Sequence, residues 1–154
     1  MAADPVDILL VEDSSSDADL TLYVLKKQQI PGRVEIVRDG AEALDYLFCT
    51  GAYAHRRMED GPKVVLLDLK LPKVDGLEVL RRIKADPRTC LIPVTVLTSS
   101  QEERDIVECY RLGANSYVVK PVDFEQFTEA VRSLGLYWLL LNRTPSVQGV
   151  ADNR

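Results

Sequence analysis

Reactive side chains follow four apolar runs of the chain, each at the point where the run ends. They are the acids Glu12, Asp13 and Asp68, the hydroxyls of Thr98 and Ser99, and the amine of Lys120, which precedes Pro121. If the runs are neighbouring parallel strands, roughly 4.8 Å apart, their carboxyl ends share one edge of a sheet. Acids, hydroxyls and an amine gathered at such an edge could carry out phosphoryl transfer onto a carboxylate.

The three acids point to a metal site. Carboxylates this close repel one another, and a bound divalent cation removes the conflict. All-oxygen ligands favour Mg²⁺ (or Mn²⁺), and Mg²⁺ also binds phosphate oxygens. We expect Asp13 and Asp68 to hold the ion with help from Glu12, so that it neutralises charge on a phosphoryl group.

Asp68 is the expected nucleophile, and its product would be an aspartyl phosphate. Lys120 would bring a second positive charge to the phosphoryl oxygens, and the hydroxyl of Thr98 would donate a hydrogen bond to them. A cis bond between Lys120 and Pro121 would aim the lysine toward the site.

The same residues have ordinary structural explanations. Asp68 could simply open a turn, Thr98 could cap the next helix and Lys120 could be a surface lysine. An acidic cluster alone is weak support, because solvated strand ends are common. The convergence of three kinds of side chain on one edge favours the phosphoryl-transfer interpretation.

Apolar runs typical of strands alternate five times with segments of helical pattern. The expected strands are 6–11, 34–37, 64–67, 92–97 and 116–119, and the expected helices are 16–29, 41–49, 75–86, 102–112 and 123 onward. Connections of this length imply parallel strands with helices on both faces. The predicted fold is an α/β, doubly wound (βα)5 flavodoxin-like sandwich with a five-stranded parallel sheet in the order 2-1-3-4-5.

Composition argues against several other classes of protein. The 154 residues carry a net charge of −5, whereas nucleic-acid binding needs basic patches. His55 is the only histidine, which excludes multi-histidine metal sites, and the three cysteines lack metal-ligand spacing. No segment is long and apolar enough to cross a bilayer, and the N-terminus lacks the features of a signal peptide. We expect a cytoplasmic protein without nucleic-acid or membrane partners.

With these residues in place, the chain resembles the receiver domains of two-component response regulators over roughly residues 7–134. The matching parts are Glu12-Asp13, Asp68-Leu69-Lys70-Leu71-Pro72 with Asp75-Gly76, Thr98-Ser99 and Lys120-Pro121. The resemblance implies that Asp68 accepts a phosphoryl group from a phosphohistidine on a sensor histidine kinase. It also implies that the backbone carbonyl of Lys70 is a further metal ligand.

The resemblance assigns the other residues to phosphoryl binding and to a switch. Thr98, Ser99 and Lys120 would contact the phosphoryl group. Thr98 and Tyr117 are similar to the switch pair of the family. On phosphorylation, Thr98 would move toward the phosphoryl group. Tyr117 would then pack inward and alter the face made by the fourth helix, the fifth strand and the fifth helix.

Two features narrow the resemblance. The loop 50–62 is longer than a receiver needs, and the sequence ends soon after its last helix, so we expect no output domain. Both features are similar to the single-domain regulators that partner bacterial and cyanobacterial phytochromes. A bacteriophytochrome kinase is therefore the expected partner.

The last helix continues from about residue 135 into an unusually apolar segment. We expect a single domain over residues 1–142 and a disordered polar tail over 143–154. Exposed apolar surface tends to mark interfaces, so we expect a homodimer through the last helix and its extension. The candidate interface residues are Phe127, Leu134, Tyr137, Trp138 and Leu141. The alternative is that this segment folds back on its own core.

Three rival functions are weighed against this interpretation. An aspartate-nucleophile phosphatase of the haloacid dehalogenase type needs a second acid two residues after Asp68, where this chain has Lys70. A flavodoxin-like cofactor carrier needs a phosphate loop after the first strand, where Glu12 and Asp13 would repel a phosphate. A degenerate receiver would lack part of the acid, hydroxyl and lysine set. We therefore expect a signalling phospho-acceptor and not an enzyme, one that catalyses at most its own phosphorylation and slow dephosphorylation.

Overall fold

Five parallel strands form one sheet in the order β2-β1-β3-β4-β5 in the computed structural model, which describes residues 6–145. The strands are β1 Ile8–Val11, β2 Val34–Val37, β3 Val64–Leu67, β4 Val94–Thr98 and β5 Ser116–Val119. The predicted topology is confirmed, and the predicted ranges of β2, β3 and β5 match the observed ones. The central pair sets the register, because Val11 at the end of β1 lies beside Leu67 at the end of β3.

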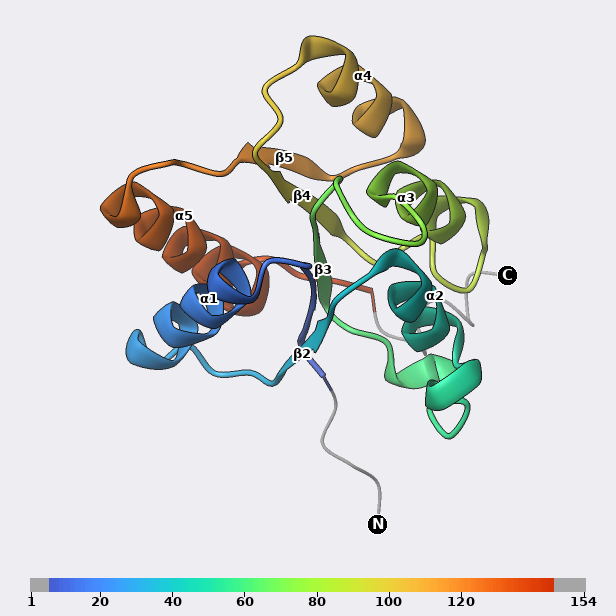
Figure 1. Ribbon diagram of the computed structural model, residues 1–154. Helices are drawn as coiled ribbons and strands as arrows, with labels where there is room; N and C mark the ends of the chain where they lie inside the picture. Colours follow the sequence, from blue (N-terminus) through green and yellow to red (C-terminus); the bar gives the residue numbers. More distant parts are fainter. Residues whose placement is uncertain (1–5, 146–154) are drawn as a thin grey trace.

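Helices cover both faces of the sheet. They are α1 Ser15–Lys27, α2 Gly40–Phe48, α3 Gly76–Ala85, α4 Glu103–Leu112 and α5 Phe124–Leu136. Figure 1 shows α1 and α5 on one face and α2 and α3 on the other, with α4 beyond α3 toward the β5 side. Four of the five helices begin at a side chain that accepts a hydrogen bond from the helix backbone, namely Ser14, Asp39, Asp75 and Asp123.

The core consists of two apolar layers separated by the sheet. Every residue of β1 and β3 is buried, and alternate side chains of each strand enter opposite layers. Leu9 and Leu67 pack toward α2 and α3, whereas Leu10 and Leu66 pack toward α1 and α5. Burial on both faces explains why the sequence of these strands is a solid apolar run instead of an alternating one.

The long segment after α2 is a folded loop. It contains two short 3-10 helices, Gly51–Tyr53 and Met58–Asp60. Arg56 lies 3.7 Å from the ring centroid of Tyr46 and donates hydrogen bonds to the carbonyls of Tyr46 and Asp60. These contacts hold the loop against α2 without needing a large apolar cluster.

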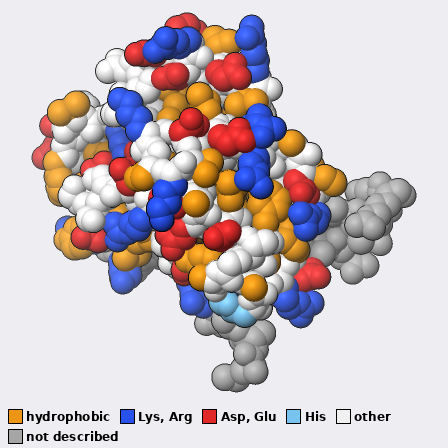
Figure 2. Space-filling model, turned by 45° about the vertical axis from the view of Figure 1, so that its right-hand side comes forward, with side chains coloured by type: hydrophobic (Ala, Val, Ile, Leu, Met, Phe, Trp, Pro, Cys, Tyr) orange, Lys and Arg blue, Asp and Glu red, His pale blue; other side chains and the backbone are white. Residues whose placement is uncertain are grey.

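Figure 2 shows the face over α2, α3 and this loop. Lysine and arginine side chains there are mixed with acidic ones, and apolar groups lie between them. His55 is exposed, as expected from its place in a polar loop.

The chain turns from α5 into a short π-helical segment, Tyr137–Leu141. Phe127 and Trp138 are only 5% and 8% exposed, because they pack into the layer between the sheet, α1 and α5. Their predicted place in a dimer interface is therefore wrong, since the apolar extension folds back on its own core at these two positions. Tyr137 and Leu141 are 48% and 71% exposed.

The described chain ends at Pro145, and residues 142–145 have no regular structure. Most of the predicted disordered tail, residues 146–154, lies outside the described residues. Among the residues that the structure describes, no helix is both long enough and apolar enough to cross a bilayer.

Gly76 couples the start of α3 to the segment after β3. A Cβ at Gly76 would lie 2.3 Å from the carbonyl oxygen of Asp68 and 2.6 Å from Cα of Leu69. We expect Gly76→Ala to lower the free energy of unfolding by about 1–3 kcal/mol, because backbone must move to make room. Urea unfolding followed by circular dichroism measures this loss.

Gly61→Ala is the matched control for this substitution. A Cβ there meets nothing closer than Ile92 at 3.5 Å, and the backbone of Gly61 is in an ordinary extended conformation. A similar loss of stability in both variants would contradict the close packing of Gly76 on Asp68.

Candidate functional site

Three carboxylates meet at the carboxyl edge of the two central strands. Glu12 and Asp13 follow β1, and Asp68 follows β3. One carboxylate oxygen from each lies within 4.8 Å of the other two. Glu12 is 3% exposed and Asp68 is 8% exposed, whereas Asp13 is exposed to solvent. The crowding that the sequence predicts is therefore present.

The backbone fixes these acids as a continuation of the sheet. The amide of Asp68 donates to the carbonyl of Val11 over 3.1 Å, and the amide of Glu12 donates to the carbonyl of Val37 over 3.0 Å. The carboxylate of Asp68 accepts a hydrogen bond from the amide of Lys70 at 3.2 Å. The register of the strands therefore positions the acids.

Lys120 enters the site from the end of β5. Its Nζ donates to Glu12 at 2.5 Å, to Asp17 at 2.9 Å and to Asp68 at 3.0 Å. The side chain of Lys120 is only 10% exposed. The possibility that Lys120 is an ordinary surface lysine is therefore excluded. Its amide donates to the carbonyl of Thr98 at 2.7 Å, which fixes the backbone from which the side chain extends.

The predicted cis bond between Lys120 and Pro121 is wrong. All peptide bonds among residues 6–145 are trans, including this one. Trans is the lower-energy isomer of an X–Pro bond, and Lys120 reaches all three carboxylates without the cis form.

Burial and pairing shift the ionisation of this cluster. Burial raises the pKa of Glu12 to about 7, although the hydrogen bond from Lys120 opposes the shift. Burial alone would lower the pKa of Lys120, but hydrogen bonds to Glu12 and Asp17 outweigh it and raise that pKa above its ordinary value. Lys120 therefore stays charged, while Glu12 is poised between its neutral and ionised forms near neutral pH.

The donor set fits a divalent cation. Glu12, Asp13 and Asp68 offer only oxygen ligands, which suit hard ions such as Mg²⁺ and Mn²⁺. The exposure of Asp13 leaves one side of the cluster open for water ligands and for a phosphate oxygen. A buried acid whose pKa is raised to about 7 is also a group that a nearby cation would favour in its ionised form.

Thr98 and Tyr117 are joined through Ser100. Thr98 is fully buried at the end of β4, and its Oγ1 accepts a hydrogen bond from the amide of Ser100 at 3.4 Å. The hydroxyl of Tyr117 donates to the carbonyl of Ser100 at 3.0 Å, and Tyr117 is half-buried. The Ser100 hydroxyl donates to Asp105 in the first turn of α4 at 2.6 Å. Ser99, which lies between Thr98 and Ser100 in the chain, is exposed.

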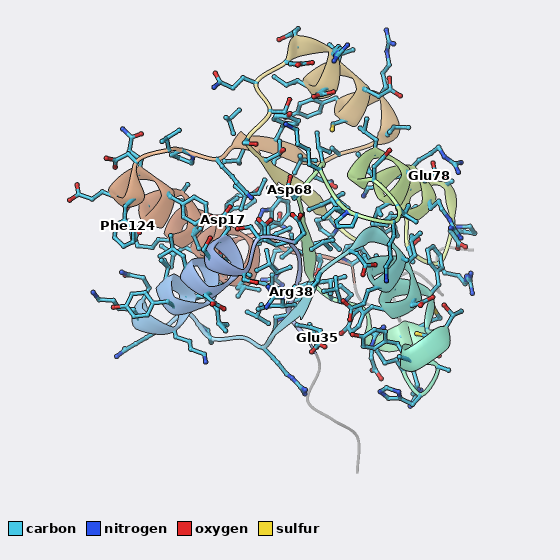
Figure 3. All side chains as sticks on the ribbon, viewed as in Figure 1. Asp17, Glu35, Arg38, Asp68, Glu78 and Phe124 are labelled. Atoms are coloured by element: carbon cyan, nitrogen blue, oxygen red, sulfur yellow. The ribbon has the colours of Figure 1, made fainter. Side chains whose placement is uncertain are left out.

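Two of these residues were not singled out from the sequence. Asp17 is four residues after Asp13 and lies in the first turn of α1, so its carboxylate could be expected near the end of β1. Ser100 follows the predicted hydroxyl pair, but its role depends on backbone groups, which no residue pattern reveals. Figure 3 shows Asp17 and Asp68 reaching the same edge of the sheet from α1 and β3.

Comparison with known proteins agrees with this geometry. A family model described as the response regulator receiver domain matches residues 8–132. The chain belongs to the response regulator receiver family. Response regulator Rcp1 of Synechocystis sp. is 41% identical over 135 residues, which are 88% of this chain and 90% of Rcp1.

Solved structures of receivers superimpose closely on this chain. The Mn²⁺-bound form of Rcp1 has a TM-score of 0.86 at 39% identity, covering 92% of this chain and 100% of Rcp1. The phosphorylated cyanobacterial phytochrome response regulator RcpA has a TM-score of 0.85 at 41% identity, covering 92% and 99%. The bacteriophytochrome response regulator AtBRR is 54% identical with a TM-score of 0.71, covering 92% and 100%.

The acidic cluster predicts that divalent cations stabilise the folded protein. At a metal concentration one hundred times the dissociation constant, we expect a gain of about 2.7 kcal/mol in the free energy of unfolding, because the ion binds the folded state alone. Asp13→Asn should lose most of this gain, since it removes the negative charge of the exposed carboxylate in the cluster. Thermal unfolding with and without Mg²⁺ measures the effect.

Asp75→Asn is the control for the metal measurement. Asp75 is an exposed helix cap at the same edge of the sheet, and asparagine caps helices as well as aspartate does. An equal metal response in the wild type and in Asp13→Asn would argue against the cluster as the metal site.

Proposed function

We propose that this receiver accepts a phosphoryl group on Asp68 from a phosphohistidine of a sensor histidine kinase. The observation that carries the proposal is the placement of the Asp68 carboxylate, 3.0 Å from the charged Nζ of Lys120 and within 4.8 Å of the other two acids. A buried nucleophile flanked by one cation and by ligands for another is suited to an anionic phosphoryl donor.

The chain itself would guide the transfer as follows. A carboxylate oxygen of Asp68 attacks the phosphorus, the new O–P bond forms and the P–N bond to the donor imidazole breaks, leaving the electron pair on the imidazole nitrogen. Lys120 stabilises the charge on the phosphoryl oxygens from the β5 side. A divalent cation held by Glu12, Asp13 and Asp68, with the backbone carbonyl of Lys70, would neutralise further charge, and Mg²⁺ is the proposed ion.

The proposed switch runs through Ser100. If the hydroxyl of Thr98 turns toward the phosphoryl group, it gives up its hydrogen bond from the Ser100 amide. The same residue holds the Tyr117 hydroxyl through its carbonyl and the first turn of α4 through its side chain. A shift of Ser100 would therefore release Tyr117 to pack inward and would move the start of α4. This couples phosphorylation to the face formed by α4, β5 and α5.

The proposed phosphorylation is tested with a small phosphodonor. Incubation with acetyl phosphate and Mg²⁺ should add the mass of one phosphoryl group in an acid-stable, base-labile adduct. The adduct should be absent in Asp68→Asn, because an amide is a poor nucleophile, and retained in Asp75→Asn. Intact-protein mass spectrometry gives the result. An adduct that persists in Asp68→Asn, or continuous turnover of phosphate esters, would refute the proposal.

The proposed input is a phytochrome-type kinase. The support is the likeness to regulators described as partners of cyanobacterial and bacterial phytochromes, which extends over 92% of this chain. Such a kinase signals in the cytoplasm, which is the proposed location. Output would take place by a change in a binding face, and no nucleic-acid contact is proposed.

We propose a homodimer through α5 and the segment after it. The support is the exposure of Tyr137 and Leu141, together with Leu140 at 54%, on one short segment. Leu134 is partly buried beside them. Large apolar side chains that remain exposed near one another are typical of interfaces.

The dimer proposal predicts a change of mass on substitution. The paired change Tyr137→Ser and Leu141→Ser should convert a micromolar dimer to a monomer without unfolding it, because Tyr137 is half exposed and Leu141 is largely exposed. Size-exclusion chromatography with light scattering measures the mass. Leu91→Ser removes an equally exposed leucine elsewhere, at 53% exposure, and should leave the dimer intact. A wild type that is monomeric at micromolar concentration would contradict the proposal.

A further inference from the structure

Asp17 is a fourth acid at the site and lies outside the metal cluster. Its Oδ2 accepts a hydrogen bond from Lys120 Nζ at 2.9 Å, while Glu12 and Asp68 accept the other two, at 2.5 Å and 3.0 Å. A lysine ammonium has three N–H donors and no more. The three carboxylates therefore occupy all the hydrogen-bonding capacity of Lys120.

The backbone of Asp17 is fixed in the first turn of α1. Its amide donates to the Oγ of Ser14 at 3.2 Å, and its carbonyl accepts from the hydroxyl of the buried Thr21 at 2.8 Å. A negative charge is also favourable at the N-terminus of a helix. The carboxylate is therefore held where α1 begins and cannot follow Lys120 far.

A phosphoryl group on Asp68 takes over the hydrogen bond that the Asp68 carboxylate now accepts, and Lys120 must move outward to reach the new oxygens. This movement stretches its hydrogen bonds to Glu12 and Asp17, so one of these two must give way. Glu12 is 3% exposed, so water cannot replace a hydrogen bond that its carboxylate loses. The side chain of Asp17 is 37% exposed, so water can replace the lost hydrogen bond there. Asp17 is the acceptor that can be given up at the lower cost.

We propose that Asp17 is a positioning residue that competes with the phosphoryl group for Lys120. In the unphosphorylated protein it binds the ammonium at the start of α1, and on phosphorylation it loses the ammonium to a phosphoryl oxygen. Asp17 thereby weakens the binding of the phosphoryl group at Asp68. This inference rests on the proposed phosphorylation of Asp68.

The test compares the affinity of the variants for beryllium fluoride, a stable mimic of the phosphoryl group, at saturating Mg²⁺. We expect Asp17→Asn to bind it about fivefold more tightly, the ratio for ~1 kcal/mol, which is the upper end for a partly exposed ion pair. Isothermal titration calorimetry gives the dissociation constants.

Two further variants separate competition from simple charge. Asp19→Asn removes the same charge from the same helix at an exposed position, and its affinity should match the wild type. Asp17→Glu keeps a carboxylate within reach of Lys120 and should also stay close to the wild type. Circular dichroism melting curves verify that all the variants are folded.

The outcomes are distinct. Unchanged or weaker binding by Asp17→Asn, with a wild type that binds the mimic, would overturn the competition while leaving phosphorylation of Asp68 intact. An equal gain in Asp17→Asn and Asp19→Asn would also overturn it, since the effect would then be long-range charge. A wild type that neither binds the mimic nor takes up a phosphoryl group would instead overturn the proposed function itself.

Discussion

The ammonium of Lys120 is the interaction on which the site depends. Two carboxylates that are less than a tenth exposed, Glu12 and Asp68, lie on neighbouring strands and would repel each other without a cation between them. Lys120 supplies that charge within the chain, so the fold tolerates the acids before any metal binds. A divalent cation would add positive charge and a phosphoryl group would add negative charge. The acids could then exchange one cation for another, and no buried carboxylate would be left without a positive partner.

The sheet makes this balance possible because its central strands are buried on both faces. β1 and β3 cannot slip against each other without moving apolar side chains into the wrong layer. The hydrogen bond from the Asp68 amide to Val11 continues their pairing past the last strand residue and so fixes the acids. The positions of the acids at the sheet edge therefore depend on the packing of the whole core. Gly76 links α3 to the same edge, because it packs directly on the Asp68 backbone.

The sequence predicted the fold and the main site residues because both follow from the ends of apolar runs. Asp68, Thr98 and Lys120 each come directly after, or complete, such a run, and parallel strands bring those ends together. The sequence did not predict Asp17 as a site residue, because its reach to Lys120 depends on how α1 packs on the sheet, although its place four residues after Asp13 is a signal that could have been used. It assigned Phe127 and Trp138 to the surface because periodicity distinguishes apolar from polar faces. Periodicity cannot show whether an apolar face is covered by the chain itself or by a second molecule.

The packing of Gly135 has a mechanical consequence. A Cβ at this position would lie 2.7 Å from the side chain of Leu25 on α1 and 2.9 Å from the side chain of Ile30 just after it, so these side chains pack directly on the α5 backbone. Sliding α5 along α1 by one residue would bring Leu134 or Leu136 into a space that holds only a hydrogen atom. α5 is therefore packed closely on α1, whereas α4 buries only the side chain of Cys109 and is the least anchored of the five helices. Among the helices around the site, α4 can therefore shift most easily, and it is the helix to which Ser100 is bound through Asp105.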